Sequence, residues 1–268
     1  MPIKPFLKWD GGKYRLLDRI FAELPPGKRL LEPFCGAASV GLNGQYDRVW
    51  LNDGNPNLVE VFAALLAGGE AFIDRCGSLF VPANNHREAY LGLREAYNTS
   101  DNPDERAALF IYLNRHGFNG LCRFNRKGGF NVPFGRDAKP YCPRLEMEAF
   151  IQNGERFTVT NLDFEAVMEA AEPGDVIYCD PPYLPLSTTA KFSDYGAEGF
   201  SMEAQRRLAE SAMRCAGRGI PVVVSNHDTA DSALLYRGAR IERFAVQRNI
   251  SCNAAKREKA AELLAVFS

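Results

Sequence analysis

The segment from Arg29 to Asp53 constrains the fold more than any other stretch of the sequence. Arg29–Glu32 is a short apolar run that predicts a buried strand, and the small residues at 33–39 predict a turn that opens a helix. A second strand is predicted at Arg48–Asn52, and Asp53 follows it directly. This order predicts an α/β fold, and an acid after the second strand is typical of a site for an adenosine-containing cofactor. Because the turn lacks a complete G-x-G-x-x-G pattern, a purely structural turn is an equally good interpretation.

The remaining pattern divides the chain into strand-bearing ends and a helical middle. Apolar residues recur at helical spacing from 57 to 115, whereas 117–135 is dense in Gly, Asn, Phe and Arg and predicts a hairpin or loop. Further elements are predicted as strands at 156–160, Asp175–Cys179 and 221–225 and as a helix at 202–216 that Ser201 would cap. We therefore predict one α/β domain, formed by residues 1–56 and 145–268, with a helical insertion at 57–144.

The composition excludes several classes of protein. With 268 residues, 46% of them hydrophobic and 24% charged, the chain can build a core without a metal or disulfide staple. Its apolar runs, such as Asp175–Cys179, fall far short of the roughly 20 residues that cross a bilayer, and the N-terminus lacks a signal-peptide pattern. Its seven cysteines are odd in number and lack zinc-site spacing. We expect a cytoplasmic protein with buried thiols, no membrane contact and no metal.

Charge is distributed unevenly along the chain. The net charge is only −1, which argues against uniform coating of a nucleic acid, but a local basic face would not show in that total. Between residues 113 and 144 a single acid, Asp137, stands against seven basic residues, so this window carries a net charge of +6. The basic residues are Arg115, Arg123, Arg126, Lys127, Arg136, Lys139 and Arg144. The window predicts a basic face on an otherwise acidic chain.

The most specific local signal is an apolar strand followed by Asp180, Pro181, Pro182 and Tyr183. The two prolines end the strand, so the carboxylate and the ring are held at its carboxyl end, where α/β sheets bind ligands. This set suits a planar amine, because the ring stacks on the base while the carboxylate and a backbone carbonyl accept the two N–H groups. Accepting both hydrogens favours a tetrahedral nitrogen whose lone pair attacks an electrophile. The alternative interpretation is a Pro-Pro turn with an acid that caps a helix.

Six motifs together resemble the Dam-type DNA adenine methyltransferases, the alpha-ordered group that uses S-adenosylmethionine. They span about residues 5–267, and their joint occurrence in this order is far more specific than any one of them. The motifs are FLKWDGGK at 6–13, EPFCGAASV at 32–40, NRHGFNGLCRFN at 114–125, FNVPFGR at 130–136, DPPY at 180–183 and SNHD at 225–228.

The resemblance implies both a fold and an activity. The implied fold is a Rossmann-like methyltransferase sheet with helices on both faces and an inserted helical DNA-recognition domain with a β-hairpin. The implied enzyme is a site-specific methyltransferase that flips an adenine out of double-stranded DNA, with GATC as the expected site. We expect it to be monomeric in solution. It would transfer a methyl group from S-adenosylmethionine to N6 by direct displacement, without a metal. The implied settings are DNA replication, mismatch repair or restriction–modification.

The resemblance assigns the chemistry to the turn after the strand Asp175–Cys179. Asp180 and the Pro181 carbonyl would accept the amine hydrogens, Pro182 would keep the turn rigid, and Tyr183 would stack on the base.

The resemblance also assigns the cofactor site. Asp53 would accept the ribose hydroxyls, and Lys13 would meet the cofactor's carboxylate. The residues expected to bind S-adenosylmethionine are Trp9, Lys13, Phe34, Gly36, Asp53, Asp163, Phe164 and Asp180. For Asp163, a simple helix N-cap is nearly as good an interpretation.

Three residues depart from the family's usual pattern in the cofactor segments. Asp10 stands where a small apolar residue is common, Ala38 replaces a frequent glycine, and Gly54 stands where a branched residue is usual. We expect these changes to affect cofactor affinity more than the type of reaction.

By the same resemblance, the basic window enters duplex DNA. Arg123 would bond the edge of a guanine, Leu121 and Pro133 would contact a thymine methyl, and Lys8 would lie near the first base pair. Phe118 would fill the stack after the adenine leaves, with Asn119 beside the orphaned base. The residues expected to contact the DNA backbone are Arg94, Arg115, Asn125 and Arg136.

The sequence alone leaves other functions open. One is an adenine methyltransferase for another short site, another is a catalytically silent DNA-binding relative, and a third is a nicotinamide-dependent oxidoreductase that only the strand–helix–strand opening favours. Cys179 is assigned to packing, because methyl transfer to an amine needs no covalent enzyme intermediate. His227 is expected to orient a neighbouring loop.

Overall fold

The computed structural model describes residues 2–184, 200–247 and 259–268. The chain divides into two compact units, each drawn from several stretches of sequence. The first unit consists of Met1–Leu17, Gly36–Gly44 and Asp53–Asn161. The second unit consists of Asp18–Cys35, Gln45–Asn52 and Leu162–Ser268. The six cysteines of the described ranges are free thiols and four of them are buried, whereas Cys252 lies outside those ranges.

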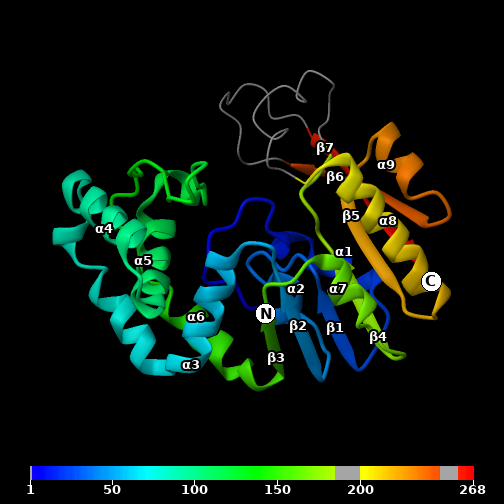
Figure 1. The fold of residues 1–268 in the computed structure, drawn as a ribbon, viewed down its shortest axis with the longest axis horizontal. Coiled ribbons are helices and arrows are strands. Elements are labelled where there is room, and N and C mark those ends of the chain that lie inside the picture. Colours follow the sequence, from blue (N-terminus) through cyan, green and yellow to red (C-terminus); the bar gives the residue numbers. More distant parts are fainter. Residues whose placement is uncertain (1, 185–199, 248–258) are drawn as a thin grey trace. The chain divides into compact units, whose positions relative to one another are not determined.

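The strands form a mixed sheet. They are β1 (Arg29–Glu32), β2 (Arg48–Asn52), β3 (Phe157–Thr160), β4 (Asp175–Cys179), β5 (Val222–His227), β6 (Arg240–Gln247) and β7 (Lys259–Phe267). The seven-stranded order is β3-β2-β1-β4-β5-β7-β6 (Figure 1). The pairs β1–β2, β1–β4 and β4–β5 are parallel, whereas β7 runs antiparallel to both β5 and β6. In β1, Leu30 aligns with Val49 on one side and Val176 on the other.

The helices follow in chain order. They are α1 (Leu17–Glu23), α2 (Ser39–Asn43), α3 (Pro56–Ser78), α4 (Arg87–Thr99), α5 (Pro103–His116), α6 (Arg144–Gln152), α7 (Phe164–Glu169), α8 (Met202–Gly217) and α9 (Ala230–Leu235). Short 3-10 turns lie at Lys13–Leu16, Pro82–Asn84, Phe118–Gly120 and Gly154–Arg156.

The core of the second unit lies between its sheet strands and two helices. β4 is buried at all of its positions, so both of its faces are covered, as expected for a central strand of an α/β sheet. Ile177 and Cys179 of β4 lie on one face and pack with the apolar side chains of α7 and α8. The buried positions of α8 recur every three or four residues, at Gln205, Leu208, Ala209, Ala212 and Cys215. This burial fixes the carboxyl end of β4, where the catalytic motif was predicted.

The first unit is largely helical, and α3, α4, α5 and α6 gather in it (Figure 1). α5 is buried continuously from Ala107 to His116 and forms the centre of this group. Asn102 caps α5 through the backbone N–H groups of Asp104 and Glu105, and a proline occupies the first helical turn.

α3 is long and apolar enough to cross a membrane if length and composition are considered alone. Two observations favour a role in the core instead. Gly69 has non-helical backbone angles, so the helix is broken into pieces too short to span a bilayer. In addition, Phe62 stacks on Phe150 of α6 with 5.1 Å between ring centroids, and Phe6 packs edge-on against both rings.

The structure confirms an α/β fold and most predicted elements, and it adds a C-terminal feature. β1, β2 and β4 occupy the predicted residues, and α8 begins after Ser201, whose hydroxyl accepts a hydrogen bond from the Ala204 N–H (3.1 Å). The antiparallel pair β6 and β7 was not predicted. The sheet is therefore mixed rather than parallel.

Candidate active site and nucleic-acid interface

The Asp180 carboxylate lies directly after β4 and is oriented by the neighbouring strand β5. The hydroxyl of Ser225 donates to Asp180 Oδ1 (2.9 Å). Ser225 is itself 3.0 Å from the hydroxyl of Tyr178, which is fully buried. Since Ser225 has only one proton, Tyr178 acts as the donor to Ser225, and the chain of hydroxyls ends on the carboxylate. The motif acid thus has a fixed direction.

The Tyr183 ring is held from two sides. The His227 ring meets the Tyr183 ring edge-on, with 4.7 Å between the two centroids. The Tyr183 hydroxyl donates to Glu262 Oε2 (3.3 Å). Burial raises the pKa of Tyr183 well above its usual value, and the nearby Asp180 carboxylate adds to this effect. His227 Nδ1 lies 2.6 Å from the Leu184 carbonyl oxygen, which confirms that His227 orients a neighbouring loop.

The backbone on each side of Tyr183 is also held by side chains. Gln205 of α8 donates to the Pro182 carbonyl (2.8 Å), and the Leu184 N–H donates to Asn226 Oδ1 (3.0 Å). Neither Gln205 nor Asn226 was singled out in the sequence as part of the site. The available signal was a glutamine on the mainly apolar face of α8 and the SNHD motif at 225–228.

Cys179 immediately precedes this turn and is fully buried. Burial raises the pKa of its thiol well above the usual value, so the thiolate required of a nucleophile is disfavoured. This agrees with the assignment of Cys179 to packing.

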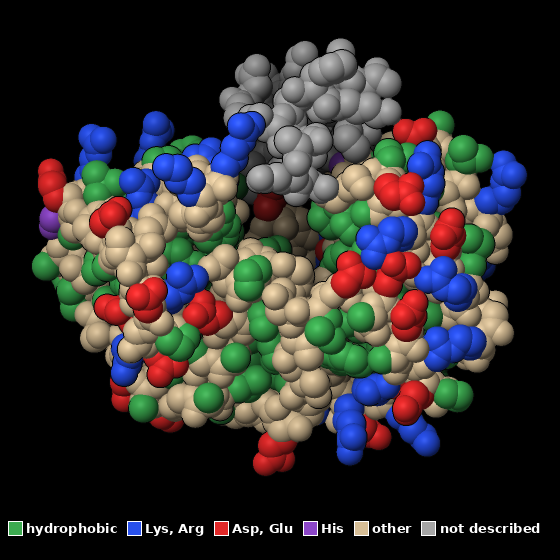
Figure 2. Space-filling model, viewed as in Figure 1, with side chains coloured by type: hydrophobic (Ala, Val, Ile, Leu, Met, Phe, Trp, Pro, Cys, Tyr) green, Lys and Arg blue, Asp and Glu red, His purple; other side chains and the backbone are tan. Residues whose placement is uncertain are grey.

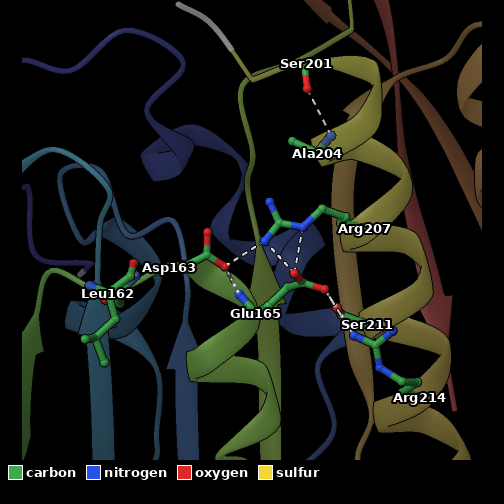
Figure 3. Close-up of polar contacts among 9 residues, drawn as sticks. Leu162, Asp163, Glu165, Ser201, Ala204, Arg207, Ser211 and Arg214 are labelled. Carbon is green, nitrogen blue, oxygen red and sulfur yellow. Dashed lines mark hydrogen bonds and ion pairs between the residues drawn. The ribbon is translucent and has the colours of Figure 1, made fainter.

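Asp163 and Phe164 form a second cluster at the start of α7, and Figure 3 shows Asp163 facing Arg207 of α8. Asp163 caps α7 through the Glu165 N–H (2.9 Å), so the helix-cap interpretation is confirmed, and Arg207 of α8 donates to the same carboxylate oxygen (3.1 Å). The Arg207 guanidinium also lies 5.1 Å from the centre of the Phe164 ring, which packs against Phe34 at 5.3 Å.

Glu165 fixes Arg207 in this position. Its Oε2 accepts from Arg207 Nε (2.6 Å), and its Oε1 accepts from Ser211 and Arg214 (3.2 Å each) (Figure 3). Burial alone would raise the pKa of Glu165, but the hydrogen bonds from Arg207 and Arg214 outweigh it and lower the pKa. Arg207 is therefore a well-anchored support for Asp163 and Phe164.

The small-residue turn of the first unit brings Gly36, Asp53 and Trp9 together. The Gly36 N–H donates to Asp53 Oδ2 (2.9 Å), and Asp53 Oδ1 accepts from the Asn55 N–H (2.9 Å). Gly36 has φ +48°, and a Cβ at this position would lie 2.9 Å from Trp9 Nε1. Only glycine allows the Trp9 ring to approach this closely. Lys13, also in this unit, is buried and donates to the Gly11 carbonyl (2.6 Å).

The three departures from the family pattern have different local consequences. Ala38 takes the left-handed conformation at the start of α2, with φ +58°, a conformation that costs roughly 1–2 kcal/mol for a residue other than glycine. Gly54 has open space where a side chain would stand, and Asp10 is exposed and bonds its neighbour's N–H (3.0 Å).

The predicted hairpin after α5 is a loop with two isolated antiparallel bridges, Gly117 with Phe134 and Phe124 with Phe130. Figure 2 shows Lys and Arg side chains gathered along one edge of the part that carries α4 and α5. Arg123 is exposed on this loop, and it donates through Nε to Asn131 Oδ1 (2.8 Å) and through Nη2 to the Asn131 carbonyl (3.2 Å).

Other predicted DNA contacts differ in their exposure. Asn119 is exposed and has φ +54°, whereas Phe118 and Leu121 are half-buried. Exposed positions also include Pro133, Arg136 and Asn125, whose Oδ1 accepts from the Lys127 and Gly129 N–H groups. Arg94 is half-buried and donates to the Val132 carbonyl (3.1 Å).

Arg115 does not lie where a contact to the DNA backbone requires it. It is 5% exposed, it bonds the Phe6 carbonyl, and its guanidinium lies 4.7 Å from the centre of the Tyr141 ring. The prediction of a surface role took no account of α5 being buried on every side. In this structure Arg115 ties the N-terminal segment to α5.

The neighbouring Asn114 makes a similar connection. Its amide bonds both the N–H (2.8 Å) and the carbonyl (2.7 Å) of Lys8, and it also donates to the Gly120 carbonyl (3.2 Å). Lys8 is thereby held against the loop, and its ammonium lies 3.9 Å from Asp137. Burial lowers the pKa of Lys8, and the nearby Arg115 lowers it further.

Comparison with known proteins places these features in a family. A model of the D12 class N6 adenine-specific DNA methyltransferases matches residues 9–250. The DNA adenine methylase of Vibrio cholerae is 47% identical over 266 residues, which cover 99% of this chain and 96% of that protein. The corresponding proteins of Escherichia coli K12 and Serratia marcescens are 44% and 43% identical and cover 98% of this chain. The chain therefore belongs to the D12 class of N6 adenine-specific DNA methyltransferases.

Proposed function

We propose that this DNA adenine methyltransferase acts on adenine in GATC sites of double-stranded DNA, with S-adenosylmethionine as the methyl donor. The observation that carries the proposal is the turn after β4, where Ser225 orients the Asp180 carboxylate and His227 and Glu262 hold the Tyr183 ring. This arrangement suits a planar base that carries an exocyclic amine.

The residues of the cofactor motifs fit an adenosine-containing cofactor. Gly36 lets the Trp9 ring pack against the turn, Asp53 offers a carboxylate suited to ribose hydroxyls, and Phe164 offers a ring beside the Asp163 carboxylate. When bound, S-adenosylmethionine supplies a methyl group on a positively charged sulfur. The residues proposed to hold it are Trp9, Lys13, Phe34, Gly36, Asp53, Asp163, Phe164 and Asp180.

The chain's own groups prepare the amine. Asp180 and the Pro181 carbonyl accept the two amine hydrogens, which favours a tetrahedral nitrogen with an available lone pair. Pro182 keeps the turn rigid, and Tyr183 stacks on the flipped base. The proposed reaction is a direct displacement and needs no nucleophile from the chain, in accord with the buried, protonated thiol of Cys179.

DNA recognition is assigned to the segment that carries the basic loop, which we place within an insertion at residues 57–144. Lys8, Leu121, Arg123 and Pro133 read base edges, and Phe118 and Asn119 fill the space that the flipped adenine leaves. Contacts to the DNA backbone come from Arg94, Asn125 and Arg136. Arg115 is given a structural role because it is buried. We further propose that the enzyme works as a monomer in the bacterial cytoplasm.

Methylation mapping tests the site assignment. A plasmid of mixed sequence is incubated with the enzyme and S-adenosylmethionine, and modified adenines are located at base resolution. We expect N6-methyladenine on both strands of GATC, and cleavage by a nuclease that requires methylated GATC together with protection from one that methylation blocks. Methylation centred on another short sequence would overturn the GATC assignment.

A further inference from the structure

A buried polar cluster lies behind the catalytic turn, in the core of the second unit. Gln205, Asn226 and Tyr236 are each no more than 1% exposed. Asn226 Nδ2 donates to Gln205 Oε1 (3.2 Å) and to the Tyr236 hydroxyl (2.9 Å). The rest of the buried face of α8, which includes Leu208 and Ala212, is mainly apolar. Polar groups at this depth are costly unless they are bonded, so their partners show what the cluster does.

Those partners are the backbone groups on either side of Tyr183. Gln205 Nε2 donates to the Pro182 carbonyl (2.8 Å), and Asn226 Oδ1 accepts from the Leu184 N–H (3.0 Å). The contacts also fix the amide of Asn226. Its oxygen must face the Leu184 N–H, which can only donate, and its nitrogen must face the oxygen of Gln205. One connected set of hydrogen bonds thus determines the direction of both peptide groups.

We propose that Gln205 and Asn226 are positioning residues for methyl transfer, acting through the backbone of Tyr183. The inference rests on the proposed role of the Asp180–Tyr183 turn. Holding the peptides before and after Tyr183 fixes the plane of its ring and the neighbouring Pro181 carbonyl, and hence the position of the stacked base relative to Asp180. Neither residue touches the base, so their loss slows the chemical step more than it weakens binding.

An apolar core of the same volume would fill this space without the cost of burying amides. Such a core would leave the Pro182 carbonyl and the Leu184 N–H without these partners and the turn free to shift. Small displacements matter because a misplacement of about 1 Å can cost on the order of 100-fold in rate. The cluster therefore accounts for a glutamine on the buried face of α8.

The test uses Gln205→Met, which preserves length and removes the amide, and Gln205→Leu, which has neither a donor for the Pro182 carbonyl nor an acceptor for Asn226. We expect both to lower the single-turnover rate constant by about 10- to 100-fold. Dissociation constants for S-adenosylmethionine and GATC duplex should stay within about threefold of wild type. Tyr236→Phe keeps the ring and removes only the hydroxyl that bonds Asn226, and it should show a smaller loss in the same direction.

A double-mutant cycle with Tyr183→Ala separates positioning from general destabilisation. If Gln205 acts through Tyr183, the losses of Gln205→Met and Tyr183→Ala are less than additive. Ile220→Ala is the matched control, since Ile220 is buried just before β5, near the end of that strand away from Asn226, and its effect on the rate constant should be small and additive. Additive losses for Gln205→Met, or an unchanged rate constant in it and in Tyr236→Phe, would overturn the inference while leaving the proposed function intact. An unchanged rate in Tyr183→Ala itself would overturn both.

Discussion

Two arginines of the loop after α5 are held differently and are expected to act differently on DNA. Arg123 is braced by Asn131, which favours a defined direction for reading a base. Arg136 is exposed, and no hydrogen bond or ion pair involves it among residues 2–184 and the other described ranges. We expect Arg123→Ala to weaken the free energy of binding to the correct site by roughly 1–3 kcal/mol and to relax discrimination at one base pair. Arg136→Ala should weaken binding to all sequences equally. The salt dependence of the DNA-binding constant should also fall, by an amount that corresponds to about one fewer released counterion.

Binding and methylation of GATC duplexes, and of duplexes altered at each position, would be compared over a salt series. Asn131→Ala is a useful companion variant, because it removes the amide oxygen that braces Arg123 and leaves the guanidinium in place. A uniform loss on every duplex for Arg123→Ala would show that this arginine anchors the loop and does not read sequence.

At the scale of single residues, the sequence identified motif positions but not their surroundings. The strand ending in Asp180-Pro-Pro-Tyr183 could be recognised because two prolines leave few conformations. Arg115 could not be placed, since a motif does not state which sides of a helix are covered, and α5 is buried all round. Gln205 was overlooked for a different reason. Its partner, the Pro182 carbonyl, is distant in sequence, so no local pattern indicates the contact.

At the scale of elements, α5 ends on a histidine that should make stability depend on pH. His116 is 2% exposed, stacks on Tyr112 with 4.0 Å between centroids, and lies 3.0 Å from the Tyr112 carbonyl oxygen through Nδ1. Burial lowers the pKa of His116 below its ordinary value of about 6.5. Below that value the unfolded chain takes up the proton more readily than the folded one. The contribution of the neutral His116 ring to the free energy of unfolding is therefore fully present above pH 6.5. This contribution is lost as pH falls, by at most about 1.4 kcal/mol per pH unit.

Thermal melting of the wild type and of His116→Gln between pH 8 and pH 5 measures this contribution. We expect the melting temperature of the wild type to fall more steeply below pH 6.5, since the glutamine does not titrate. Parallel curves for the two proteins would contradict the assignment of this pH dependence to His116.

Element prediction succeeded where local and tertiary preferences agree. β1, β2 and β4 are short apolar runs buried in the sheet, and their ends match the prediction. β7 was not predicted because its sequence, KAAELLAVF, is rich in helix-forming residues, yet it lies as a strand between β5 and β6. Pairing of β7 with strands on both sides outweighs the local preference for a helix. No pattern within the segment indicates this pairing.

At the scale of the whole molecule, the proposed residues fall into sets that each unit organises by itself. The first unit carries the Gly36–Asp53 turn and the basic loop, and the second carries the Asp180 turn and the Asp163–Phe164 cluster. Family membership excludes the nicotinamide-dependent oxidoreductase that the strand–helix–strand opening alone allowed. Each unit combines three separated stretches of sequence, and such bounds cannot be recognised from a local sequence pattern.

Removal of the Asp180 carboxylate tests most directly whether the turn after β4 carries out methyl transfer. Single-turnover transfer of labelled methyl from S-adenosylmethionine to a GATC duplex would be measured for the wild type and Asp180→Ala, with cofactor binding determined separately. We expect the rate constant to fall by at least about 10³-fold while cofactor binding is largely kept, because the carboxylate meets the reacting amine more than the adenosine. Retention of more than about a tenth of the wild-type rate would contradict the assignment of Asp180 to the chemical step.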